Sequence, residues 1–238
     1  MTRLSLSRSL LPLALALFAA GCSETGALPT GVQQPIAAAP HFVRWAGSSP
    51  PQFTTIGAPS GGVVNGVFLA SASSALSLDH YTASFWAVRG EQRSVQINYA
   101  DSAGGTNSPF LRLVLVDPTY VPGQGDLAPG DSVLITVTVD TVNLGVSLEP
   151  TGLRFGDPAQ LQIWYGGAHG DLNGDGVVDS TDASIEAQLL SMWYREGADS
   201  AWTQIPATHA VLDKSFTSAL PHFCSYDLAF DDGYAVSW

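Results

Sequence analysis

The 238-residue sequence has one lysine, two cysteines, two methionines and five glutamates. Two cysteines cannot form the set of disulfides that holds many small secreted domains together. Nine basic residues stand against 21 acidic residues, which gives a net charge of −12. A protein that binds nucleic acid electrostatically needs a positive surface, so this composition excludes nucleic acid as a partner.

The sequence also lacks the motifs of the commoner enzyme classes. It has no H-E-x-x-H, G-x-S-x-G, C-x-x-C, P-loop or G-x-G-x-x-G pattern. His222 and Cys224 are the closest pairing of a base with a nucleophile, but strand alternation places both on one face, where we expect core residues. With so few glutamates, a paired-carboxylate hydrolase would depend on scattered aspartates. We therefore predict that the protein is not an enzyme.

Residues 1–21 have the pattern of a secretory signal peptide. Arg3 and Arg8 precede an apolar run, Leu10–Ala20, and small residues follow it. The run is too short for a membrane-spanning helix, which needs about 20 apolar residues. Cleavage after residue 21 would remove two basic groups and no acid, so the mature side chains would carry about −14. Such a surface favours divalent cations or neutral partners.

The tetrapeptide Ala19-Ala20-Gly21-Cys22 resembles a bacterial lipobox. The resemblance implies that Cys22 is acylated and anchors the protein to a membrane through its acyl chains. Ser23 next to it is similar to the signal for sorting to the outer membrane, so we predict a cell-envelope lipoprotein, with its periplasmic or surface face left open. Ordinary cleavage without acylation of Cys22 is the alternative. Residues 22–40 have no periodicity and are expected to form a flexible tether.

Residues 41–238 show the pattern of an all-β domain. Short runs rich in Val, Ile, Thr and aromatic residues recur between Gly, Pro, Asp and Asn clusters. Such clusters, expected to be loops, include residues 101–109, 118–131 and 149–152. This spacing predicts an antiparallel β-sandwich. The expected strands are Ser84–Val88, Ser94–Tyr99, Phe110–Val116, Val133–Val139, Leu161–Tyr165, Ser191–Arg195, Val211–Phe216 and Tyr234–Trp238. The aromatic C-terminus leaves a small outer-membrane β-barrel as an alternative.

One segment, residues 171–182, has the spacing of an EF-hand calcium loop. Oxygen-bearing residues occupy the ligand positions, and Gly176 stands where the chain must turn sharply. Calcium takes six to eight hard oxygen ligands, and four carboxylates in one loop would repel each other without a cation. We predict a Ca²⁺ site with the ligands Asp171, Asn173, Asp175, Val177 (through its carbonyl), Asp179 and Asp182.

The loop departs from a standard EF-hand in two ways. Residue 182 is aspartate rather than glutamate, and the preceding stretch 165–170 is too rich in glycine for an incoming helix. We expect a strand before the loop and a short helix after it, capped by Thr181 or Asp182, with Ile185 and Leu189 on its apolar side. Residues 166–190 resemble one dockerin repeat, which implies calcium binding. Dockerins use two repeats to bind their partner, and this chain has one.

A second resemblance covers residues 110–228. The stretch 148–163, with its Pro-x-Gly-Leu-x-Phe pattern, Trp202 and the segment Pro221–Tyr226 are similar to ZU5-type β domains, with Cys224 where serine is usual. The resemblance implies a β-sandwich interaction module without catalysis. Residues 41–109 match it only loosely, so a separate small domain there stays open.

Taken together, these patterns predict a non-catalytic, lipid-anchored cell-envelope module that calcium stabilises and that acts in surface attachment or protein assembly. The protein or carbohydrate partner is not identified. The alternative is a carbohydrate-binding or hydrolytic envelope protein, because six tryptophans could supply a sugar-stacking face. Aromatic residues on sandwich strands more often belong to the core.

Overall fold

The computed structural model describes residues 39–47, 51–58, 63–64, 67–68, 81–100 and 108–231. The predicted signal peptide, Cys22, nearly all of the predicted tether and the predicted strand 234–238 lie outside these residues. No helix in the described ranges is both long enough and apolar enough to cross a membrane.

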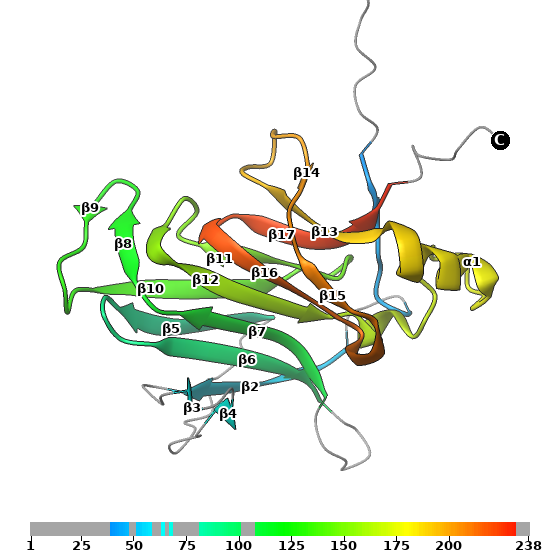
Figure 1. Cartoon of the computed structure of the whole chain (residues 1–238), viewed down its shortest axis with the longest axis horizontal. Helices are drawn as coiled ribbons and strands as arrows, with labels where there is room; N and C mark the ends of the chain where they lie inside the picture. Colours follow the sequence, from blue (N-terminus) through cyan, green and yellow to red (C-terminus); the bar gives the residue numbers. More distant parts are fainter. Residues whose placement is uncertain are drawn as a thin grey trace, which may run out of the picture. The chain divides into compact units, whose positions relative to one another are not determined.

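Two antiparallel sheets form the domain, as the sequence predicts (Figure 1). In order across the first sheet lie β14 (Thr203–Gln204), β13 (Leu190–Arg195), β17 (Ser225–Phe230), β11 (Gly145–Glu149), β10 (Ser132–Val139) and β5 (Thr82–Val88), and β1 (His41–Phe42) also pairs with β17. In order across the second lie β15 (Thr208–Ala210), β16 (Ser215–His222), β12 (Arg154–Trp164), β7 (Pro109–Leu115), β6 (Arg93–Tyr99) and β2 (Phe53–Ala58). In the second sheet β8 (Pro118–Val121) pairs with β12 and with β9 (Gly125–Asp126), and β3 (Val63–Val64) and β4 (Val67–Phe68) form a separate pair.

Strand alternation builds the core between the sheets. On β10, Val133, Ile135 and Val137 are buried, whereas their outward neighbours are the exposed Leu134 and the polar residues Ser132, Thr136 and Thr138. Thr136 on that outer face lies 3.1 Å from Ser84 of β5, Oγ1 to Oγ. A shift by one residue would exchange the two faces of the strand, so this pattern fixes the register. Residues from the second sheet that complete the core include Val95, Ile97, Leu111, Leu113, Leu161 and Ile163.

The strands β2, β11 and β17 are not among those expected, and two further segments have another structure than the sequence predicts. The stretch 118–131, expected to be a loop because of its prolines and glycines, contains the β8–β9 hairpin, which β12 stabilises through pairing with β8. The expected strand 211–216 begins instead with a 3₁₀ turn at Val211–Asp213, followed by Lys214 in the left-handed region at φ 52°. Only then does β16 start, because that turn reverses the chain between β15 and β16.

The segment between β12 and β13 connects the two sheets. It consists of a 3₁₀ turn η1 (Gly166–Ala168), the loop 169–179, the helix α1 (Ser180–Ser184) and the π-helical turn η2 (Ile185–Leu189). A strand therefore precedes the loop and a short helix follows it, as expected. Figure 1 shows α1 at one end of the sandwich and the β8–β9 hairpin at the other.

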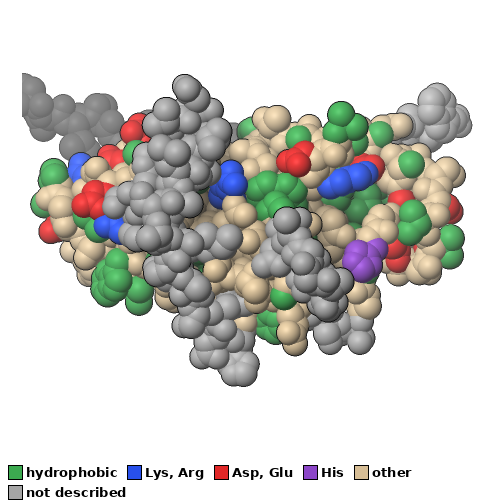
Figure 2. All heavy atoms as spheres, turned by 90° about the horizontal axis from the view of Figure 1, so that it is seen from below, with side chains coloured by type: hydrophobic (Ala, Val, Ile, Leu, Met, Phe, Trp, Pro, Cys, Tyr) green, Lys and Arg blue, Asp and Glu red, His purple; other side chains and the backbone are tan. Residues whose placement is uncertain are grey.

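Figure 2 shows one face of the molecule, on which the visible Lys and Arg side chains lie apart from one another rather than in a stripe. This distribution agrees with the small number of basic residues in the sequence.

Candidate functional site

The first half of the predicted calcium loop is folded around Asp171. Its Oδ1 accepts a hydrogen bond from the Gly174 amide at 2.8 Å, and its Oδ2 accepts one from the Gly176 amide at 2.9 Å. Both glycines have positive φ, 74° and 86°. This backbone conformation resists a side chain, which explains the glycine at the sharp turn of the motif. Asp171 therefore holds its carboxylate toward the inside of the loop.

Asn173 and Asp175 continue the same turn. The Asp175 amide donates to Asn173 Oδ1 at 3.0 Å, and Asn173 Nδ2 donates to Asp175 Oδ2 at 2.9 Å. Asp175 Oδ1 accepts from the Val177 amide at 2.8 Å. The structure thus links three of the predicted ligand side chains through one short stretch of backbone.

Asp179 and Asp182 form a capping box at the start of α1. The Thr181 amide donates to Asp179 Oδ1 at 2.6 Å, and the Asp179 amide donates to Asp182 Oδ2 at 2.9 Å. The cap residue is Asp179, so the prediction that Thr181 or Asp182 caps the helix is wrong. The reason is that the helix begins at Ser180, two or three residues earlier than those caps would imply, which moves Asp182 to the third helical position.

Asp182 also closes the loop on itself. Its side chain is 3% exposed, and Oδ1 accepts from the amides of Leu172 at 2.7 Å and Asn173 at 3.3 Å. Burial raises the pKa of this carboxyl, but the backbone amides of residues 172, 173 and 179 outweigh it and hold the pKa below its usual value. The residue therefore ties the end of the loop to its beginning whether or not it binds an ion.

Apolar contacts behind the loop come from different residues than the spacing suggests. Val178, at the usual hydrophobic position of the motif, is 63% exposed. Leu172 and Ile185 are buried instead, and Leu189 packs against the core. Ile185 and Leu189 thus form the apolar side of the short helical segment, as predicted.

A polar cluster fixes the helical segment to both neighbouring strands. The Tyr165 hydroxyl donates to Glu186 Oε1 at 2.9 Å and lies 2.8 Å from His209 Nε2, and Lys214 pairs with Glu186. Burial lowers the pKa of His209, while the carboxylate of Glu186 opposes that shift. Sequence reasoning did not identify this cluster, because its members are separated by up to 49 residues and belong to no known motif.

The residues of the loop fit calcium in their chemistry. Asp171, Asn173 and Asp175 supply only oxygen donors, which suits a hard cation rather than a softer transition metal. Within the described residues, no three His, Cys, Asp or Glu side chains converge as a metal cluster. The calcium site, with all six ligands, therefore stays a prediction that the geometry of the loop supports but does not test.

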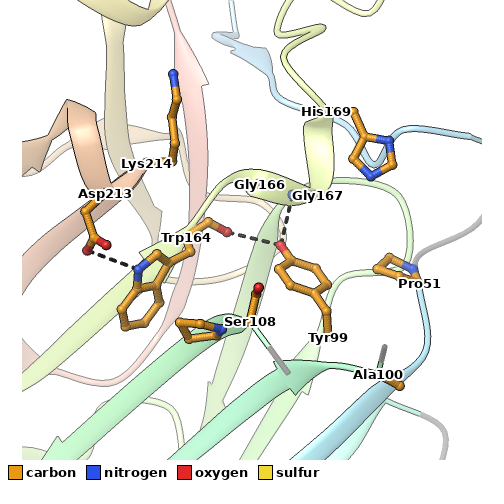
Figure 3. Close-up of a pocket in the computed structure, with 11 residues that line it drawn as sticks. Pro51, Tyr99, Ala100, Ser108, Trp164, Gly166, Gly167, His169, Asp213 and Lys214 are labelled. Atoms are coloured by element: carbon orange, nitrogen blue, oxygen red, sulfur yellow. Dashed lines mark hydrogen bonds between the residues drawn. The ribbon is translucent and has the colours of Figure 1, made fainter. Parts of the chain in front are cut away.

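A hollow of about 550 Å³ lies next to the loop (Figure 3). The Tyr99 hydroxyl donates to the Trp164 carbonyl at 3.2 Å and accepts from the Gly167 amide at 3.1 Å, and Trp164 Nε1 donates to Asp213 at 3.1 Å. Burial raises the pKa of Tyr99. His169 lies on the rim of the hollow, at the opposite side from Asp213. The side chains of Tyr99, Trp164 and Asp213 in the lining are thus paired with each other or with the backbone.

His222 and Cys224 are not equivalent in the structure. Cys224 is buried, as predicted, and burial raises the pKa of its thiol to about 11, which keeps it protonated and unreactive. His222 is only half-buried, and its Nε2 lies 3.2 Å from Glu196 Oε1. The prediction that both belong to the core is therefore wrong for His222, because β16 ends there and its edge faces solvent.

The tryptophans do not gather on one surface among the described residues. Trp45 is buried and donates from Nε1 to the Asp140 carbonyl at 2.8 Å, whereas Trp86 on β5 is 58% exposed. Trp164 borders the hollow near the calcium loop, and Trp202 packs against Phe42 with ring centroids 4.9 Å apart. Trp45, Trp86, Trp164 and Trp202 thus lie in different surroundings, and the carbohydrate-binding alternative stays a prediction.

Comparison of the chain with protein-family models, with curated proteins and with solved structures finds no match. The resemblances to ZU5-type domains and to dockerin repeats accordingly stay predictions from the sequence.

Proposed function

We propose that this protein is a non-catalytic, lipid-anchored binding or structural module of the bacterial cell envelope, with Ca²⁺ bound in the loop 171–182. The anchor would be the acylated Cys22, with residues 22–40 as the tether. The β-sandwich would present a binding surface away from the membrane, in surface attachment or protein assembly.

The main observation in support of the proposed calcium site is the position of the Asp171 carboxylate. Both of its oxygens accept hydrogen bonds from backbone amides of the loop, those of Gly174 and Gly176. The positive φ of Gly176, at the sixth position, is the sharp turn that the calcium motif requires. Asp182 then joins the two ends of the loop. The loop contains four carboxylates within twelve residues, and a divalent cation bound there would neutralise part of their charge.

We expect chelation to lower the stability of the domain without unfolding it. The hydrogen bonds of Asp171 and Asp182 already fold the loop, and the core between the sheets contains none of the ligands. Binding at ten times Kd would add about 1.4 kcal/mol, and each kcal/mol shifts Tm by about 2–4 °C in a protein of this size. Calorimetry in saturating calcium and in EDTA measures the shift. Identical melting temperatures in the two buffers would refute a structural ion.

We expect the variant Cys22→Ser to leave the membrane fraction. Serine cannot form the thioether through which the acyl chains attach, and the chain would keep no other lipid anchor of this kind. Fractionation of cells that express the parent and the variant, with detection of the folded domain, measures the change. If the variant stays with the membrane as firmly as the parent, acylation of Cys22 is not what holds the protein there.

A further inference from the structure

A small polar cavity of about 170 Å³ lies on the outer face of the first sheet. Asp227 points into it from β17, where it alternates with Tyr226 and Leu228 of the core. Arg195 of β13 and the loop residue Asp140 also line the cavity. Phe42 and Trp202, whose rings pack together, supply apolar walls of the cavity.

Asp227 is a buried carboxyl with an unused acceptor. The residue is 4% exposed, and its Oδ1 has no hydrogen-bond partner within the described structure. The carboxyl lies over Gly145, its partner across the strands, and a Cβ at residue 145 would overlap Oδ1. Glycine at this position therefore leaves the room that the carboxyl occupies.

Arg195 offers the matching donor. Its guanidinium lies 4.8 Å from the centre of the Trp202 ring, and Nη1 donates to the Ala198 carbonyl at 3.2 Å. Its Nε is buried and, like Asp227 Oδ1, has no partner among the described residues. A buried polar atom without a partner costs about 1–3 kcal/mol, so one donor and one acceptor left open in the same cavity indicate a missing polar group.

Charge restricts the chemistry of that group. A cation would suit Asp227 and Asp140 but would leave the Arg195 Nε–H unsatisfied and would face a positive guanidinium. An anion would suit Arg195 but would be repelled by the two carboxylates. A hydroxyl can donate to Asp227 and accept from Arg195 at once. The volume is roughly that of six water molecules, which suits one six-membered sugar ring rather than an oligosaccharide.

We propose that this cavity binds a single neutral sugar ring, a free hexopyranose or the end unit of a glycan. Asp227 Oδ1 accepts a hydrogen bond from one hydroxyl, and Arg195 Nε donates to a hydroxyl oxygen. This inference names the class of ligand that the proposed binding module takes. It rests on the proposed function only for the location of the protein in the cell envelope. The cavity contains no residue of the calcium loop, so the sugar proposal and the calcium proposal can fail independently of each other.

The proposal is tested by titrating the full mature protein near pH 8 with glucose, galactose, mannose and N-acetylglucosamine. Binding is measured by calorimetry and by ligand-observed NMR. At least one of the four binds the parent. Asp227→Asn replaces the charged acceptor, and Arg195→Lys keeps the positive charge but removes the Nε–H. Each lowers the affinity about tenfold or more. The matched control is Asp157→Asn, which removes the charge of an exposed aspartate on β12 and binds like the parent.

Melting curves show whether each variant is folded. We expect titrations in calcium and in EDTA to give the same sugar affinity. The proposal is overturned if none of the four sugars binds, in which case the cavity holds water only. It is also overturned if sugar binding is unchanged in either Asp227→Asn or Arg195→Lys, since the sugar would then occupy another site.

Discussion

Replacing Asp227 with asparagine will stabilise the folded protein near pH 8 and will change its stability little near pH 4. Burial, and then the carboxylate of Asp140, raise the pKa of Asp227 from 3.8 to about 7, while the guanidinium of Arg195 opposes the shift. Between these two pH values the folded state keeps a proton that the unfolded state has lost. Stability contributed by Asp227 is therefore full below pH 3.8 and is lost as the pH rises toward 7.

The size of the effect follows from the shift in pKa. About three pKa units correspond to roughly 4 kcal/mol, and an asparagine, neutral at every pH, avoids most of this cost but leaves its amide to be paired. We expect a gain on the order of 2–4 kcal/mol near pH 8 and less than about 1 kcal/mol near pH 4.

Urea unfolding of parent and variant at a series of pH values measures this difference, with Asp157→Asn as the control for loss of a negative charge. A difference between parent and Asp227→Asn that does not depend on pH would mean that Asp227 ionises normally in the fold. If Asp227 lowers the stability of the fold at neutral pH and also binds a ligand, the protein keeps this binding residue at a cost in stability.

The variant Asp175→Ala will lose more calcium affinity than Asp179→Ala. Asp175 lies in the same turn as Asp171 and Asn173, and its exposed carboxylate accepts hydrogen bonds from Asn173 and Val177. If it binds calcium, its loss removes a charged ligand, worth roughly 1.5–3 kcal/mol. Asp179 is the cap of α1. Its loss should cost the helix about 1 kcal/mol of stability and have a smaller effect on calcium affinity.

Calorimetric titration of calcium into the parent and the two variants, together with their melting temperatures in EDTA, separates affinity from stability. Ser180→Ala, in the same short helix but without a carboxylate, serves as the matched control. If Asp175→Ala binds calcium as tightly as the parent, the loop is an acidic turn and the metal assignment is wrong.

Much of the fold could be predicted because many of its strands can be recognised from the pattern of their own residues. From Ile135 to Val139 on β10, apolar residues alternate with threonine, and a strand with one buried face needs that period of two. The β8–β9 hairpin was missed for the opposite reason. Its prolines and glycines indicate a loop, and only pairing with β12, more than 30 residues away, makes it part of a sheet. Local preference cannot report a partner so distant in sequence.

The two candidate sites differ in the same way. The loop 171–182 is continuous in sequence, so its spacing alone predicts the turn, the position of Gly176 and the short helix after it. The cavity beside Asp227 is also lined by Asp140, Arg195 and Trp202, which lie 25 to 87 residues from Asp227 in the sequence. The one local indication of this cavity in the sequence is Asp227, an aspartate within the otherwise apolar stretch Tyr226–Phe230.

The sequence by itself determined the all-β class, the faces of its strands and the oxygen-rich loop, since each depends on residues close to one another along the chain. The tertiary structure decided which strands are neighbours, that Asp182 closes the loop as a buried acceptor, and that Asp227 and Arg195 face one cavity with an unused acceptor and donor. Those outcomes depend on burial, and burial is set by the packing of distant segments against each other rather than by any local pattern.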